Sequence, residues 1–381
     1  MKESLLFACK NGDGTRSVYL LPVISGGITR PHFGLRMQST DDNSTKKISL
    51  NLIPLNDIST KGAKSLTKSP IAGCLGLLRK DGVDFVSVIT RCTLVADLGA
   101  DRRIYRIDQV AFYAIIDDTF DALTDEESTV SASGSPPTEL TNPTSDLANY
   151  LSSGNFYFSY SHDLTQSVQC ESNDTLHSWR SCSRTFFWNA FLLDPVREFA
   201  EGLPADQLEF IEHGGLFLVA MQGFVQSATV PQSTLNTNRM DIAVVSRLSC
   251  HRAGTRFLSR GIDDDGHVSN HVESEVLVVS TNGDSKKHVF SYLITRGSVP
   301  VFWDQQGLQF GRPTFQITRS AAATQPAFDR HFDMMIRRYG MVHCLDLLSQ
   351  KESSPEVLLS SAFKHHAEQY PGYPDTVTLS Q

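Results

Sequence analysis

The sequence lacks the cysteine patterns that mark a metal site or a disulfide framework. Its seven cysteines include no C-x-x-C pair and are scattered through 381 residues. A zinc ribbon needs such pairs, and a small disulfide-stapled domain needs a higher cysteine density. We therefore predict no metal, no other cofactor and a reducing environment. The cysteines are Cys9, Cys74, Cys92, Cys170, Cys182, Cys250 and Cys344.

The sequence also lacks an apolar run long enough to cross a bilayer. The best candidate, IAGCLGLLRKDGVDFVSVIT, is broken by Arg79, Lys80 and Asp81. The first residues, MKESLLFACKNGDG, show no signal-peptide pattern. We expect a cytoplasmic protein without a transmembrane segment, whose contact with endomembranes or the plasma membrane is peripheral.

Positive charge is not in excess either. The formal net charge is -8 and the pI is about 5.8, which argues against general binding to nucleic acids. A local basic pocket on such a chain is still compatible with a specific anionic ligand. Hydrophobic residues make up 40% of the sequence, which is enough for a sizeable core in a chain of this length.

The apolar patterns that are present predict mixed α and β structure. SVYLLPVIS and IYRIDQVAFYAII predict strands in the first 120 residues, and Asp81-Gly82 predicts a hairpin turn between two more. The acidic stretch 121–147, rich in Ser, Thr and Pro, predicts a linker or a long surface loop. Beyond it, TFFWNAFLL predicts a helix, and GGLFLVAMQGFVQ, MDIAVVSRLSC and KKHVFSYLITR predict strands.

The last part of the chain predicts a helix, a strand and a second helix. Pro326 is expected to open a helix with Phe328 and Phe332 on its apolar face. The short run MVHCLDLL follows, and Ser353 to Glu356 form a capping-box pattern ahead of VLLSSAFKHHAEQ. This succession favours an α/β layer architecture.

Cys250 and Arg256 have the spacing of a cysteine-dependent phosphatase. Such an enzyme holds a thiolate in a loop of backbone N–H groups that opens a helix. After Cys250 the sequence supplies one nearby glycine, Gly254, and no apolar period that would start a helix. We therefore interpret Cys250 as a small residue at the end of a strand.

The stretch 246–275 is nevertheless dense in charge of both signs. Arg252, Arg256 and Arg260 alternate in it with acidic residues around three glycines. Composition alone leaves two interpretations open, an interlocked ion-pair network near a site and a solvated, twisted hairpin. The acidic residues are Asp263, Asp264, Asp265, Glu273 and Glu275.

Five blocks of the sequence, taken in order, resemble the Sac-domain phosphoinositide phosphatases, and most nearly the Sac module of the synaptojanin type. The resemblance extends from about residue 150 to 368, and the strand-rich first 120 residues resemble the N-terminal Sac subdomain of that family. The blocks are SGNFYFSYSHDLTQS, FFWNAFL, SRLSCHRAGTRFLSRGIDDDGHVSNHVESE, RGSVPVFWDQQGLQFGRP and FDRHFDMMIRRYGMVHCLDLL.

The resemblance implies a two-lobed fold of the α+β or α/β class. An N-terminal β-rich Sac subdomain (1–120) would be joined through 121–147 to an α/β phosphatase subdomain (148–370), with a divergent tail at 371–381. The sequence does not contain all of the phosphatase subdomain that the resemblance implies. Its α/β sheet is therefore expected to expose an edge and an apolar face, and the chain to fold poorly.

The resemblance also implies a phosphatase that acts on phosphoinositide lipids at a membrane surface. Its nucleophile would lie in a Cys-x5-Arg loop, which this sequence does not contain at the expected place. The phosphatase subdomain is therefore expected to be incomplete, through a natural shortening or a truncated gene model, and the chain to be inactive as written. The alternative is a non-catalytic Sac-like module that binds phosphoinositides or protein partners.

The resemblance further suggests residues for a groove that receives a lipid phosphate. Arginines are expected to contact the phosphate, acidic and amide side chains to orient them, and a tryptophan to lie near the pocket wall. A purely structural role stays equally open for these residues. No catalytic residue and no metal ligand is predicted. The candidates are Arg256, Arg260, Asp263, Asp265, Asn270, Glu273, Glu275, Arg296 and Trp303.

Overall fold

A computed structural model of the chain describes most of its residues. Of the predicted linker 121–147, residues 121–141 lie outside the described residues, and so does Arg256, while the helix Ser145–Leu151 begins within its last three residues. The described ranges are 3–11, 15–23, 33–42, 45–58, 62–99, 102–116, 118, 142–170, 178–230, 239–254, 259–281, 287–306 and 314–380.

Contacts within the chain group these residues into two compact units. The first unit comprises Met1–Gln166, Ser172–Val244 and Val278–Val289. The second comprises Ser167–Glu171, Val245–Leu277 and Phe290–Gln381. These limits are not those of the predicted subdomains, 1–120 and 148–370, which stay a prediction.

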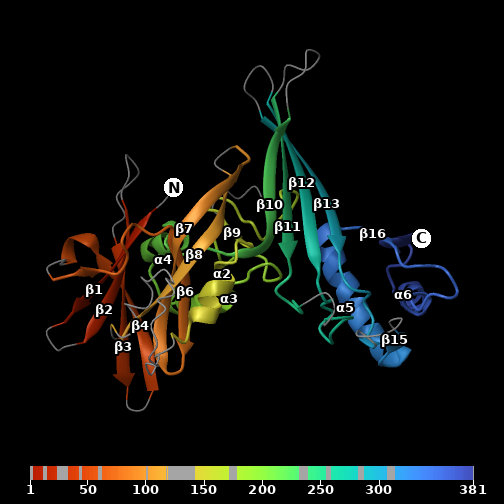
Figure 1. Cartoon of the computed structure of the whole chain (residues 1–381), viewed down its shortest axis with the longest axis horizontal. Coiled ribbons are helices and arrows are strands. Elements are labelled where there is room, and N and C mark those ends of the chain that lie inside the picture. The colour runs from red at the N-terminus through yellow and green to blue at the C-terminus, as the bar shows by residue number, and fades with distance from the viewer. Residues whose placement is uncertain are drawn as a thin grey trace, which may run out of the picture. The chain divides into compact units, whose positions relative to one another are not determined.

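The first unit begins with a five-stranded antiparallel sheet in the order β4-β3-β2-β1-β5 (Figure 1). Apolar residues alternate along its strands, so that Leu6, Val18, Leu20 and Leu35 lie on one buried face. A 3-10 helix, Leu55–Asp57, follows the fourth strand. The strands are β1 (Ser4–Lys10), β2 (Arg16–Pro22), β3 (Phe33–Asp42), β4 (Thr45–Pro54) and β5 (Lys64–Ser65).

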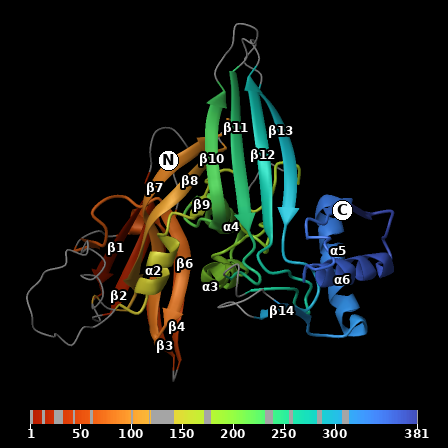
Figure 2. The same cartoon turned by 45° about the vertical axis from the view of Figure 1, so that its right-hand side comes forward.

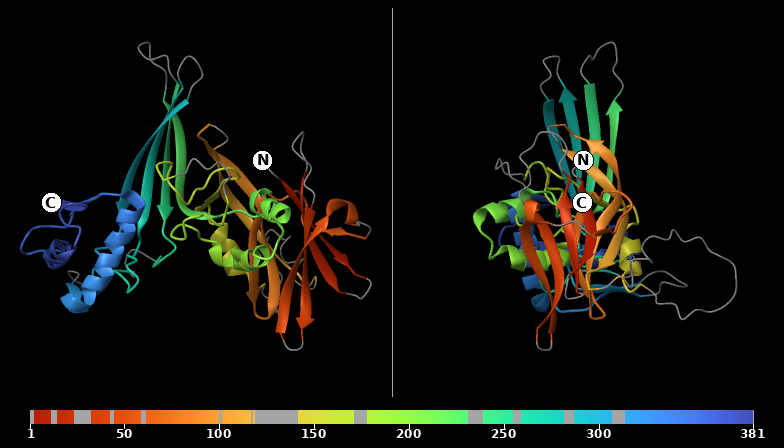
Figure 3. Two further views of the ribbon diagram at one scale, coloured as in Figure 1. Left: turned by 180° about the vertical axis from the view of Figure 1, so that it is seen from behind. Right: turned by 90° about the vertical axis from the view of Figure 1, so that its left-hand side faces the viewer.

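A larger sheet has the strand order β13-β12-β11-β10-β9-β8-β7-β6. Figures 2 and 3 show β10 to β13 running side by side as long strands. Asp81 (φ 52°) and Gly82 (φ 79°) form the turn between β6 and β7, where Lys80 pairs with Val83, which confirms the predicted hairpin. The strands are β6 (Gly73–Lys80), β7 (Val83–Asp97), β8 (Arg103–Ala114), β9 (Phe156–Phe158), β10 (Met221–Val230), β11 (Arg239–Leu248), β12 (Val272–Thr281) and β13 (Lys287–Arg296).

Two apolar cores lie in the first unit. One joins the five-stranded sheet to Val86 and Val88 of β7 and to Val196 of α3. The other contains Phe85 and Phe112 and is completed by α2. The helices here are α2 (Ser145–Leu151), α3 (Ala190–Ala200) and α4 (Ala205–His213).

A buried asparagine ties the start of α3 to β6 and to the segment before β10. The Nδ2 atom of Asn189 donates to the carbonyl oxygens of Leu75 and Leu218, both at 2.8 Å, and its Oδ1 accepts from the Ala220 N–H at 2.7 Å. The helix predicted over TFFWNAFLL begins only at Ala190. Asn189 uses its side chain to satisfy backbone groups of β6 and of the segment before β10, and the residues before it are not helical.

The second unit contains a β-α-β connection. The strands β16 (Val342–Leu345) and β17 (Val377–Ser380) are parallel, with Val342 opposite Val377, and α6 (Val357–Gln369) lies between them in sequence. Parallel strands require such a crossover. Phe328 and Phe332 of α5 (Ala321–Tyr339) pack with Val377 in a separate core. A two-stranded sheet of β14 (Trp303–Gln306) and β15 (Thr314–Ile317) precedes α5.

One predicted helix start is wrong, and the helix predicted over VLLSSAFKHHAEQ is confirmed but without its predicted cap. The helix α5 begins at Ala321 with Ser320 as its cap, whose Oγ accepts from the Ala323 N–H at 3.4 Å, so Pro326 lies inside the helix. The helix α6 begins after Glu356, whose Oε2 accepts from the Ser349 N–H at 2.7 Å. The glutamate is thus engaged by a preceding loop and forms no capping box.

The chain is therefore rich in β structure, with a large antiparallel sheet and helices, as expected for the α+β class. None of the helices in the described part of the chain has both the length and the apolar character needed to span a membrane.

Candidate functional site

A buried ion network lies in the second unit, on the strands β11 and β12. Glu273 and Glu275 are two residues apart on β12, so their side chains leave the same face of the sheet. Arg247 of β11 lies between them. Its Nη1 donates to Glu273 at 3.1 Å and its Nη2 to Glu275 at 2.7 Å, and the three side chains are no more than 1% exposed.

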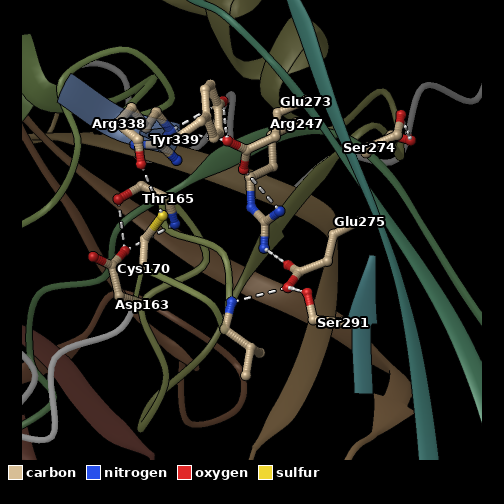
Figure 4. A network of polar contacts seen from close by, with 12 residues as sticks. Asp163, Thr165, Cys170, Arg247, Glu273, Ser274, Glu275, Ser291, Arg338 and Tyr339 are labelled. Carbon is tan, nitrogen blue, oxygen red and sulfur yellow. Dashed lines mark hydrogen bonds and ion pairs between the residues drawn. The ribbon is translucent and has the colours of Figure 1, made fainter. Parts of the chain in front are cut away.

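The last turn of α5 completes the network (Figure 4). The Nε of Arg338 donates to Glu273 at 2.9 Å, and the hydroxyl of Tyr339 donates to the same carboxylate oxygen. On the other side, Glu275 accepts from the Val168 N–H at 2.9 Å and from the Ser291 hydroxyl at 2.6 Å. Four separate segments of the second unit thus meet at two carboxylates.

The electrostatics of this network favour the charged forms of Glu273 and Arg338. Burial alone would raise the pKa of Glu273, but Arg247 and Arg338, together with the hydrogen bonds it accepts, hold that pKa below its ordinary value. Burial would lower the pKa of Arg338, but Glu273 raises it above the ordinary value. Burial, followed by the charge of Glu273, raises the pKa of the Tyr339 hydroxyl. The tyrosine therefore stays protonated and acts as a donor.

This geometry determines what the network is able to do. Two arginines balance two carboxylates, so burial leaves no net charge among the four groups. For Arg247 to bind a phosphate it would have to leave both carboxylates, which would strand buried charges at high cost. The network is suited to holding β11, β12 and α5 together. Its arginines, Arg247 and Arg338, are not the three that the charge pattern singled out, so an ion-pair network of Arg252, Arg256 and Arg260 stays a prediction.

Arg260 and Trp303 form a second cluster. The guanidinium carbon of Arg260 lies 5.4 Å from the centre of the Trp303 ring, and its Nη2 donates to Gln305 at 2.7 Å. The indole N–H of Trp303 donates to the Val299 carbonyl at 3.3 Å. The structure therefore brings together two of the candidates, Arg260, which the resemblance suggested for the groove, and Trp303, which it suggested for the wall; their roles stay predictions.

The other predicted residues lie in turns and at a strand end. The Oδ1 of Asp263 accepts from the N–H groups of Asp265, at 3.1 Å, and His267, at 2.8 Å, which closes a turn. Asn270 has a φ of 55°, and its Nδ2 donates to the Ser259 carbonyl at 3.3 Å. Arg296 ends β13 and is exposed, as is Asp265.

Four histidines lie around the same loop. The rings of His251 and His267 stack, with centres 4.0 Å apart. Burial lowers the pKa of His271 and of His331 to about 4. The Nδ1 of His331 lies 3.0 Å from the Gly266 carbonyl oxygen, an acceptor, so that nitrogen carries the proton. In the described residues, no cluster of three or more His, Cys, Asp or Glu side chains is arranged to hold a metal ion.

The sequence profile of the SacI homology domain matches residues 72–379, most of the chain and all of the second unit's core. The chain belongs to the SacI homology domain family. This SacI homology domain contains both the buried network and the Arg260–Trp303 cluster.

Known proteins align with most of the chain. The chain is 34% identical over 328 residues to the inositol-1,4,5-trisphosphate 5-phosphatase 1 of Schizosaccharomyces pombe, over 83% of this chain and 30% of that protein. It is 31% identical to the polyphosphatidylinositol phosphatase INP53 of Saccharomyces cerevisiae, over 83% of this chain and 28% of that protein. Human synaptojanin-2 is 35% identical, over 77% of this chain and 17% of that protein. The chain thus spans less than a third of each of these relatives.

Three residues of the SacI homology domain were missed by reasoning from sequence. Arg247, Arg338 and Tyr339 hold Glu273 and Glu275, yet only the two glutamates were candidates. The sequence did carry a signal for Arg247. In the alternating run IAVVSRL, its side chain lies on the same face as the buried Ala243 and Val245. An arginine at such a position predicts buried carboxylate partners.

Proposed function

We propose that this SacI homology domain recognises phosphoinositide headgroups at a membrane surface, as part of a phosphoinositide phosphatase. We further propose that the 381 residues do not hydrolyse the phosphate ester by themselves, and that the two compact units correspond to the two lobes implied by the resemblance. Support comes from relatives that are named as polyphosphatidylinositol phosphatase and as inositol trisphosphate phosphatase.

The proposal that the 381 residues do not hydrolyse the phosphate ester rests on the environment of the cysteines. Thiolate catalysis needs a cysteine with a lowered pKa, usually at a helix N-terminus. Burial instead raises the pKa of Cys74 to about 12, and that of Cys344 to about 11. Burial also raises the pKa of Cys92 to about 11, with a smaller contribution from Asp108. In each case the thiol is held in its unreactive form.

Cys250 lies in a place that is no better suited to catalysis. It follows the end of β11 at Leu248 and is half-buried, and among the described residues the next helix is α5, which begins at Ala321. A phosphate-binding loop joins its cysteine directly to a helix, because the N–H groups of the first turn hold the anion. The spacing between Cys250 and Arg256 is therefore interpreted as a coincidence.

For recognition of the headgroup we propose Arg260, supported by Trp303. A guanidinium is planar and presents paired donors that match phosphate oxygens, and an aromatic ring beneath it fixes its orientation. Arg256 and Arg296 are proposed as further contacts. Glu273 and Glu275 are assigned to the brace formed with Arg247 and Arg338.

A phosphate-release assay on vesicles that contain phosphatidylinositol 4-phosphate tests the catalytic part. The 381-residue chain should release no more phosphate than a mock preparation, and the Cys250→Ser variant should be the same. Release that Cys250→Ser abolishes would overturn the proposal.

Vesicle binding tests the recognition part. Addition of phosphatidylinositol 4-phosphate should strengthen binding, and Arg260→Gln should remove most of this gain. Arg103→Gln serves as the matched control, because Arg103 is an exposed arginine of β8 in the first unit. Equal binding by both variants would contradict the role of Arg260.

A further inference from the structure

The strand β13 exposes an unusual row of side chains. It is the last strand in the order of the large sheet. Ser291 turns its hydroxyl toward Glu275, so the odd-numbered residues face the buried network. Phe290, Tyr292 and Ile294 leave the opposite face, and they are 63%, 66% and 53% exposed. Together with the exposed Arg296, which has the same alternation, they form what we call the β13 strip.

The neighbouring strands extend this exposed face. Ser246 of β11 and Ser274 of β12 share a hydrogen bond of 2.8 Å and are both only half-buried. Val276, two residues beyond Ser274, is half-buried as well. Within the second unit, this face therefore carries aliphatic, aromatic and hydroxyl groups beside an arginine. The carboxylates of the same strands, Glu273 and Glu275, lie on the other face and are paired with arginines.

We propose that the β13 strip docks on the headgroup region of an anionic lipid bilayer. The choice of a bilayer as the partner rests on the proposed function. Charge complementarity selects the face: a chain of net charge -8 is repelled by an anionic surface, so contact is favoured where carboxylates are turned inward and a cation is turned outward.

The chemistry of the strip fits the bilayer interface. Tyrosine places an apolar ring and a polar hydroxyl at the boundary between acyl chains and headgroups, where aromatic residues are enriched in membrane proteins. Phenylalanine and isoleucine on either side add apolar area that gains free energy when it leaves water. The long stem of Arg296 allows its charge to reach lipid phosphates.

Sedimentation with vesicles that contain phosphatidylcholine and phosphatidylserine, without phosphoinositide, tests the strip. The full chain should bind these vesicles, and Phe290→Ser/Tyr292→Ser/Ile294→Ser should lower the partition coefficient by about tenfold or more. The matched control is Met341→Ser/Leu345→Ser/Leu347→Ser, which removes apolar residues that are 78%, 65% and 90% exposed elsewhere in the unit and should leave binding unchanged. Arg296→Gln should weaken binding by about fivefold, and only with phosphatidylserine present.

A second measurement does not depend on loss of binding. Tyr292→Trp places a fluorophore in the strip with little change of volume, and brominated lipids should quench its emission beyond that of the parent chain. Failure of the parent chain to bind phosphatidylserine vesicles, or binding without this extra quenching, would overturn the proposal. A further outcome would also overturn the proposal: the parent chain is a dimer, and the triple serine variant is a monomer that binds vesicles as the parent does. The strip would then join two copies of the chain.

These outcomes are separable from those of the proposed function. If phosphatidylserine binding depends on the strip but phosphatidylinositol 4-phosphate adds nothing, the headgroup role fails and the docking surface stands. If the phosphoinositide gain depends on Arg260 while the triple serine variant binds phosphatidylserine normally, the docking surface fails and the headgroup role stands.

Discussion

Glu273 shows how hydrogen-bonded and charged partners offset the free-energy cost of burying a carboxylate. Its carboxylate is fully enclosed and accepts from Arg247, Arg338 and Tyr339. Removal of one charge from such a group leaves its partners desolvated without compensation, which is far more costly than loss of an exposed ion pair.

We therefore predict that Glu273→Gln lowers the free energy of unfolding by about 3 to 5 kcal/mol. Urea unfolding monitored by circular dichroism measures this change. Asp194→Asn is the control, because it breaks an exposed pair with Arg197 in the first unit and should cost no more than about 1 kcal/mol. Equal losses in the two variants would mean that the network does not stabilise the fold.

The buried histidines predict a dependence of stability on pH. The pKa of His271 and of His331 is about 4 in the folded chain, against an ordinary value of 6.5. The unfolded chain therefore binds protons between pH 6.5 and 4 that the folded chain does not bind. Stability should be independent of these groups above pH 6.5 and should fall below it, by up to about 1.4 kcal/mol per pH unit for each histidine.

Urea unfolding at a series of pH values checks this prediction. His331→Gln, which keeps a donor for the Gly266 carbonyl, should remove about half of the slope between pH 6.5 and 5. An unchanged slope in this variant would show that other groups cause the acid sensitivity.

At the scale of single elements, β6 depends on a glycine. Gly76 has a φ of 126°, and a Cβ at that position would lie 2.2 Å from the Leu192 carbonyl oxygen of α3. The strand register shifts between Cys74 and Gly76, so the close approach to α3 coincides with a bulge.

Gly76→Ala should therefore destabilise the first unit by at least about 3 kcal/mol, through strain and a backbone clash. Gly82→Ala, at φ 79° with open space around it, is the matched control and should cost only about 1 kcal/mol. The thermal midpoint of both variants is the measurement. A loss at Gly76 no greater than that at Gly82 would show that α3 moves away without cost.

Elements were predictable from sequence where local pattern and tertiary packing agree. The hairpin at Asp81-Gly82 and the strands in MDIAVVSRLSC and KKHVFSYLITR follow from turn chemistry and β-branched residues. The capping box at Ser353 failed because Glu356 binds the Ser349 N–H instead. That contact depends on a loop whose position no local pattern encodes.

The candidate site was predictable only in part, for a related reason. Glu273 and Glu275 stood out through the charge density of 246–275 and its resemblance to a family block, and Trp303 through its place in another such block. Arg338 and Tyr339 were missed, because they reach Glu273 from the end of a helix that is 65 residues further along the chain. Such long-range pairing is set by packing, and the sequence around the helix gives no sign of it.

At the scale of the whole molecule, the two units differ in how well their sheets are covered. In the first unit, Phe85, Val86, Val88 and Ile89 of β7 are fully buried. In the described part of the second, β16 and β17 form a sheet of two parallel strands, and Leu345 is 65% exposed. Parallel sheets are normally covered on both faces. The expectation that the chain folds poorly stays a prediction. This contrast indicates that unfolding would begin at the sheet of β16 and β17.

We predict that the strands Val342–Leu345 and Val377–Ser380 open before β7 of the first unit does. Amide hydrogen exchange followed by mass spectrometry should show rapid exchange in these two strands and the slowest exchange in residues 85–89, because the apolar core around the two-stranded sheet is smaller than the cores around β7. Thermal unfolding should then show more than one transition. Equal protection of β7 and β16, with a single cooperative transition, would instead mean that contacts of the β-α-β connection stabilise it as strongly as the cores of the first unit stabilise β7.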